Sequence, residues 1–70
     1  MTKWNYRVVL KDGVYGIHEA YYSKTDEITS IITNPVDNLY IDYETLDTGL
    51  KLMLLATTKP TIDFETMKEI

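Results

Sequence analysis

The chain of 70 residues has no cysteine and only one histidine, His18. Disulfide bonds are therefore excluded, and a structural zinc site, usually built from several thiolate and imidazole ligands, has too few donors. A chain this short forms one domain, residues 1–70, whose small core is marginal alone. We expect packing or self-association to supply the missing stability, and we expect no cofactor.

Long apolar runs are also absent. No stretch approaches the roughly 20 apolar residues of a membrane span. Residues 1–7 contain no apolar core of the kind found in signal peptides. The sequence therefore predicts a cytoplasmic protein without a membrane partner.

Basic residues are scarce, and the net charge is −4. Residues 1–24 carry four basic and two acidic side chains, whereas residues 25–70 carry three basic and nine acidic ones. Affinity for phosphates comes mostly from Lys and Arg, so a chain without a basic stripe predicts no nucleic-acid partner. Its acidic surface is typical of a solubilising surface or of one that faces a protein partner.

A hairpin is the clearest local prediction. Apolar and polar residues alternate over about residues 4–11 and 14–22, and Asp12-Gly13 between these runs is typical of a type I′ turn. Such a turn fixes the register and places Arg7 opposite His18. One side, the aromatic face, comprises Trp4, Tyr6, Val8, Leu10, Tyr15, Ile17 and Tyr21. The other side, the arginine face, comprises Asn5, Arg7, Val9, Lys11, Gly16, His18, Ala20 and Tyr22. We expect the aromatic face to meet the core.

Glycine in the middle of a predicted strand, at position 16, marks either a β-bulge or a close approach of backbone. Without a bulge, Glu19 is a misfit on the aromatic face. With a bulge, Glu19 turns outward and His18 turns inward. The sequence leaves both alternatives open.

Beyond the hairpin, a β-branched run predicts a third strand over about residues 28–33. Asp42 is a typical N-cap for a helix over about residues 43–58, which Pro60 ends. We expect its core face to carry Leu46, Leu50, Met53 and Thr57, which recur at helical spacing. Residues 59–70 are predicted as a tail that forms a short turn or frays.

This order predicts an α+β fold in which one C-terminal helix packs on a three-stranded antiparallel β-meander of order 1-2-3. Strands 1 and 3 are then the edges of the sheet. Because one helix covers only one face of a sheet, we expect the arginine face to be open or used.

The chain resembles a family of small bacterial proteins. Trp4–Val9 is similar to the WNYRVV-type opening of that family, and Tyr15–Tyr22 is similar to its YGIHEVYY-type second strand. The similarity continues through Asn34-Pro35-Val36, a helix rich in Leu and Met, and Lys59-Pro60. The second turn, without glycine, and the third strand, without an aromatic residue, depart from the family pattern. No function is established for the family, so the resemblance implies only a soluble domain encoded by a bacterium or a phage.

Arg7, His18 and Tyr22 are the candidate ligand-binding residues. An arginine offers a fork of donors, a histidine titrates near neutral pH and a tyrosine stacks on rings, so the set suggests an anion or a nucleotide. The simpler interpretation, which we favour, is cross-strand pairing of polar groups. Adjacent His18 and Glu19 point to opposite faces, and no nucleophile lies beside a base. We therefore predict no enzymatic activity, no catalytic residue and no metal site.

Leucines that fall away from the predicted core face of the helix, Leu52 and Leu55, are candidate partner-interface residues. Ile28 and Ile32, on a third strand without charges, are candidates for pairing at a sheet edge. The sequence thus predicts a small acidic interaction or regulatory domain that acts by protein contact with a partner or with itself, as a homo-oligomer. A phage-encoded inhibitor fits this description. The alternative is a small anion- or nucleotide-binding protein.

Overall fold

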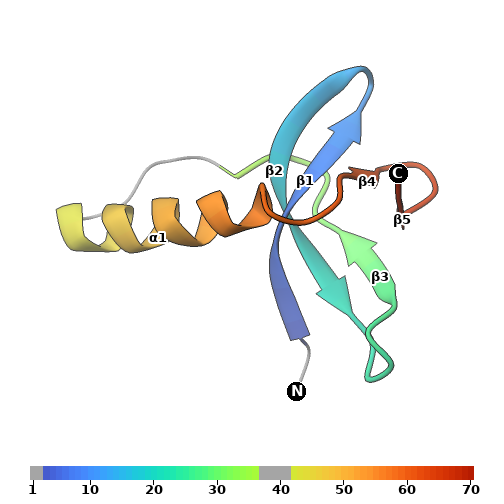
Figure 1. The fold of residues 1–70 in the computed structure, drawn as a ribbon, viewed down its shortest axis with the longest axis horizontal. Coiled ribbons are helices and arrows are strands. Elements are labelled where there is room, and N and C mark those ends of the chain that lie inside the picture. The colour runs from blue at the N-terminus through green and yellow to red at the C-terminus, as the bar shows by residue number, and fades with distance from the viewer. Residues whose placement is uncertain (1–2, 37–41) are drawn as a thin grey trace.

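A computed structural model describes residues 3–36 and 42–70. Its elements are β1 (Lys3–Lys11), β2 (Val14–Tyr22), β3 (Ile28–Ile31), α1 (Tyr43–Ala56), β4 (Ile62–Asp63) and β5 (Lys68–Glu69). The strands form one sheet of order β3-β2-β1-β4-β5 (Figure 1). The predicted α+β class is confirmed, but within the described residues the sheet has five strands rather than three.

The hairpin has the predicted register. β1 and β2 pair antiparallel, with Arg7 opposite His18. Asp12 and Gly13 both have positive φ, 53° and 77°, as a type I′ turn requires. The short turn thus determines which side chains of the two strands lie together.

Gly16 is a point of close approach rather than a bulge. The register of β1 and β2 runs past it without interruption. A Cβ at this position would lie 3.3 Å from Pro35 Cβ and 3.3 Å from His18 Nε2. The segment that follows β3 therefore passes close over the backbone of β2.

The predicted tail, residues 59–70, belongs to the sheet. β4 runs parallel to β1, with Ile62 opposite Val9, and β5 returns antiparallel to β4. The prediction that strand 1 is an edge was therefore wrong, since β3 and β5 are the outermost strands. Both C-terminal strands have only two residues, too few to produce a recognisable alternating pattern.

The sheet curls over the arginine face. β3 and β4 pair with opposite sides of the hairpin in the strand order, yet Figure 1 shows both to its right, with α1 to its left. Val9, Ala20 and Ile62 form a fully buried cluster, against which pack Tyr22, Ile28, Ile31 and Phe64.

Val9 and Ala20 belong to the arginine face, so two expectations were wrong. The deepest core lies on that face and not on the aromatic one, and the arginine face is covered rather than open. The physical reason is that the outer strands close over it, whereas Trp4 on the aromatic face stays 47% exposed.

Helix α1 begins at its predicted cap and ends slightly before the predicted boundary. Its buried residues are Gly49, Met53 and Ala56. Its first turns extend away from the strands in Figure 1. Leu50, which we expected in the core, is 43% exposed. The Cα radius of gyration is 12.3 Å, larger than the about 11 Å typical of a compact domain of this length.

The N-cap gives a first prediction. Asp42 Oδ1 accepts hydrogen bonds from the Thr45 backbone N–H and hydroxyl, each at 2.8 Å. The backbone hydrogen bond, and then that of the hydroxyl, lower the pKa of Asp42 below its ordinary value. Replacing Asp42 with alanine is expected to reduce helix content in far-ultraviolet circular dichroism, because the first-turn N–H loses its acceptor.

The pH dependence follows from the same cap. A carboxyl whose pKa is lower in the folded state stabilises the fold above its unfolded pKa, about 3.9, and this contribution is lost as the pH falls through the folded pKa. Asp42→Asn is the control, because it keeps an oxygen acceptor without the charge. If Asp42→Ala retained wild-type helicity at neutral pH, the cap would be unimportant.

Candidate functional site

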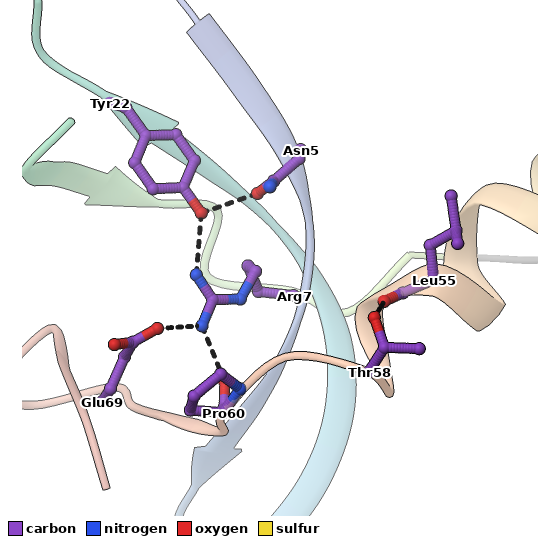
Figure 2. Close-up of polar contacts among 7 residues, drawn as sticks. All are labelled: Asn5, Arg7, Tyr22, Leu55, Thr58, Pro60 and Glu69. Atoms are coloured by element: carbon purple, nitrogen blue, oxygen red, sulfur yellow. Dashed lines mark hydrogen bonds and ion pairs between the residues drawn. The ribbon is translucent and has the colours of Figure 1, made fainter.

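A buried cation, Arg7, joins three parts of the chain. Its side chain is held between the hairpin and the C-terminal segment (Figure 2). Nη1 donates to Tyr22 Oη at 3.0 Å, and Nη2 donates to Pro60 O at 2.7 Å and to Glu69 Oε2 at 2.6 Å. Tyr22 Oη in turn donates to Asn5 Oδ1 at 2.7 Å. One guanidinium therefore ties β1 to β2, to the segment after α1 and to β5.

The charge of Arg7 is balanced within the protein. Burial is the largest influence and lowers its pKa, but the hydrogen bonds to Glu69 and Tyr22 together raise the pKa above the ordinary value. Arg7 Nε is buried, and no described residue accepts a hydrogen bond from it. A phosphate or nucleotide would have to displace Glu69 from the guanidinium, so the observed arrangement favours a structural role for this cation.

The other predicted members of the ligand-binding set are placed differently. Tyr22 is hydrogen-bonded to Arg7, whereas His18 is 3% exposed and has its Nδ1 2.8 Å from Ile32 O. Because a carbonyl oxygen only accepts, Nδ1 carries the proton. The structure thus joins Arg7 with Tyr22 and gives His18 a separate partner.

Glu69 and Pro60 are partners of Arg7 that sequence reasoning missed. Glu69 follows Arg7 by 62 positions, in a segment predicted to be a tail. It carries no local signal that could have indicated the pairing, because the contact depends on how β4 and β5 fold back onto the sheet.

The predicted interface leucines line a hollow beside the hairpin. Leu52 and Leu55 are 48% and 55% exposed. They border a hollow of about 340 Å³ between the end of α1 and the first half of β1. We call this hollow the helix groove, lined by Trp4, Asn5, Tyr6, Leu52, Leu55, Ala56 and Lys59. Its walls are mainly apolar, and Lys59 adds a positive charge at their border.

A second apolar surface lies on the same helix. Tyr43, Leu50 and Leu54 are 80%, 43% and 68% exposed. Their spacing of seven and then four residues places them on one side of an α-helix. We call these three residues the outer stripe. Sequence reasoning missed it because Leu50 was assigned to the core; the heptad-like spacing was the signal that could have found it.

The predicted edge-strand residues have different environments. β3 is an outer strand, as expected. Ile28 packs against the buried cluster of Val9, Ala20 and Ile62, whereas Ile32 is 43% exposed just beyond the strand. Ile28 therefore contributes to the core, and only Ile32 of these two presents a large apolar surface to solvent.

Neither a metal site nor a membrane-spanning helix is found among the described residues. Within residues 3–36 and 42–70, no three His, Asp or Glu side chains gather closely enough to hold a metal ion. Of the helices in the described part of the chain, none has the length and apolar character needed to cross a membrane. Arg7 joins distant parts of the fold, and the two apolar surfaces of α1 are exposed to solvent.

Comparisons with known proteins do not assign the chain to a family. No protein-family model, no curated protein and no solved structure matches it. The resemblance to small bacterial proteins with WNYRVV- and YGIHEVYY-type motifs stays a prediction. A functional proposal therefore depends on the geometry alone.

Proposed function

We propose that this protein is a small interaction domain without enzymatic activity, which assembles with further copies of itself through α1. The observation that carries the proposal is the exposure of five large apolar side chains on one helix, namely Tyr43, Leu50, Leu52, Leu54 and Leu55, each at least 43% exposed. Clustered apolar exposure of this kind marks contact surfaces, whereas single exposed leucines are ordinary.

The size of the core supports the same proposal. Among the described residues, the buried apolar side chains are Val9, Ala20, Met53, Ala56 and Ile62, of which two are alanines. A domain of about 60 residues buries only about 60% of the surface of its unfolded chain. Association that occurs only in the folded state adds stability by mass action. Self-association through α1 would thus supply what the core lacks.

The experiment that tests the proposal disrupts the helix groove. The double variant Leu52→Asp with Leu55→Asp is expected to lower the solution mass toward the 8.1 kDa of a single chain, because two carboxylates in an apolar contact cannot be desolvated cheaply. Mass is measured by light scattering coupled to size-exclusion chromatography over a range of concentrations, and circular dichroism checks that the variant remains folded.

The matched control is Tyr15→Asp. Tyr15 is 66% exposed near the hairpin turn and belongs neither to the helix groove nor to the outer stripe, so the substitution adds a carboxylate to another exposed apolar position. It should leave the mass at the wild-type value. A wild-type protein that remains a single chain at every concentration would disprove the proposal, as would a folded double variant that still assembles.

A further inference from the structure

The helix groove and the outer stripe lie on different sides of α1. Of the two leucines that border the groove, Leu52 lies about 160–180° around the helix from Tyr43, Leu50 and Leu54, and Leu55 lies about 100–140° from them. The groove is hollowed, between helix and strand. The stripe begins at Tyr43 in the first turn of α1, the end of the helix that extends away from the strands (Figure 1), and reaches Leu54 in the last turn. One chain therefore carries a concave and a projecting apolar surface.

We infer that these two surfaces bind each other between copies, so that the outer stripe of one copy seats in the helix groove of the next. This inference rests on the proposed self-association and specifies its geometry. The partner at each surface is a second copy of this chain, and the contact is head-to-tail rather than two-fold symmetric.

Charges at the two surfaces agree with this pairing. Lys59 borders the groove, and in the described part of the chain no acidic side chain pairs with its ammonium. Asp47 lies on the side of the outer stripe, between Tyr43 and Leu50. Its carboxylate is half-exposed and pairs with exposed Lys51 at 2.9 Å, a type of pair that contributes little. Asp47 of one copy is therefore available to Lys59 of the next.

The amount of apolar surface that is removed from water favours a head-to-tail contact over a two-fold symmetric dimer. A two-fold contact of groove with groove, or of stripe with stripe, would leave the other surface in water. A two-fold contact of groove with stripe in both directions would need the two surfaces to face the same partner, but Leu52 and the outer stripe lie about 160–180° apart around α1. A head-to-tail contact buries the groove of one copy and the stripe of another. When the contact repeats along a row of copies, only one groove and one stripe, at the two ends of the row, stay exposed. Such contacts close into rings or continue as filaments.

The test combines two variants, each with one damaged surface. The groove variant carries Leu52→Asp with Leu55→Asp. The stripe variant carries Tyr43→Asp with Leu54→Asp, at the two most exposed stripe positions, where folding is least affected. Each variant alone should be a single chain. Mixed in equal amounts, they should form a complex of one copy each, with twice the mass of 8.1 kDa, because one intact groove then meets one intact stripe.

The results separate this inference from the proposed function. If wild type never assembles, both fail. If wild type assembles but the folded groove variant keeps the wild-type mass, both also fail. If only the stripe variant keeps the wild-type mass, or if the mixture contains only single chains, the head-to-tail geometry is overturned and self-association through α1 stands. Should either double variant prove unfolded by circular dichroism, the single variants Leu55→Asp and Leu54→Asp replace them in the same mixing experiment.

The charge pair provides an independent check. Lys59→Asp and Asp47→Lys should each weaken assembly about two- to five-fold, as expected for an exposed ion pair. Both substitutions in one chain should restore it, since the two positions then exchange their charges and opposite signs still meet between copies. A doubly substituted chain that assembles no better than either single variant would overturn the pairing of Asp47 with Lys59.

Discussion

Replacing Ile62 with alanine is expected to lower the free energy of unfolding by about 2–5 kcal/mol, because it removes a fully buried branched side chain and leaves a cavity. Ile62 is 0% exposed and packs with Val9 and Ala20 at the centre of the curled sheet. A chain of this length has a total stability of about 4–10 kcal/mol, so the substitution should remove a large part of it.

Equilibrium unfolding in urea measures this effect as a shift of the midpoint at constant slope. Ile70→Ala is the matched control, since Ile70 is 68% exposed and its truncation should change stability by less than about 0.5 kcal/mol. If Ile62→Ala behaved like the control, β4 would not cover Val9, and the C-terminal segment would be a tail after all.

The second large effect is expected at the buried ion pair. Replacing Glu69 with alanine removes the carboxylate from a guanidinium whose side chain is 6% exposed. Breaking a fully buried pair costs about 3–5 kcal/mol. Glu69 itself is 52% exposed, so water screens the pair and can partly replace the carboxylate. We therefore expect a loss of about 1–3 kcal/mol in the free energy of unfolding.

Glu65→Ala, in the exposed turn between β4 and β5, is the control for a lost acidic charge and should have little effect. A double-mutant cycle with Arg7→Met isolates the interaction, because Glu69→Ala should cost much less once the guanidinium is gone. Equal costs of Glu69→Ala in both backgrounds would show that the ion pair does not stabilise the fold.

The hairpin could be predicted because its determinants are local. Asp12-Gly13 takes the two positive φ values of its turn, and the register of β1 with β2 follows from the turn alone. Asp42 likewise specifies the start of α1 through a hydrogen bond to Thr45, three residues later. Each feature depends on side chains that are near one another in the sequence.

The covered face of the sheet could not be predicted for the opposite reason. Aromatic residues such as Trp4 made one face resemble a core, while Arg7 and His18 made the other resemble a surface. The structure buries the polar pair because distant groups accept their hydrogen bonds, Glu69 and Pro60 O for Arg7 and Ile32 O for His18. The alternation of polar and apolar residues along a single strand gives no information about those distant acceptors.

The candidate interface was predicted in part. Leu52 and Leu55 are exposed as expected, but the groove also needs Trp4 and Lys59, which meet them only after the helix has packed on β1. The outer stripe was not predicted, because a leucine at helical spacing was assumed to belong to the core. That assumption fails at Leu50, which is 43% exposed although the preceding Gly49 is buried, because the face that packs is that of Gly49, Met53 and Ala56.

The central position of β1 has a consequence for how fast the protein folds. β1 meets β2 across a tight turn, but it meets β4 through the pairing of residue 9 with residue 62. The entropy cost of closing a loop grows with its length, and contacts distant in sequence slow folding. We expect the hairpin to form first, while Val9 is still exposed to water. Residues 60–69 then pack against it in a later step. The rate-limiting event is then the arrival of this last segment, which completes the sheet and brings Glu69 to the charged guanidinium of Arg7 in one step.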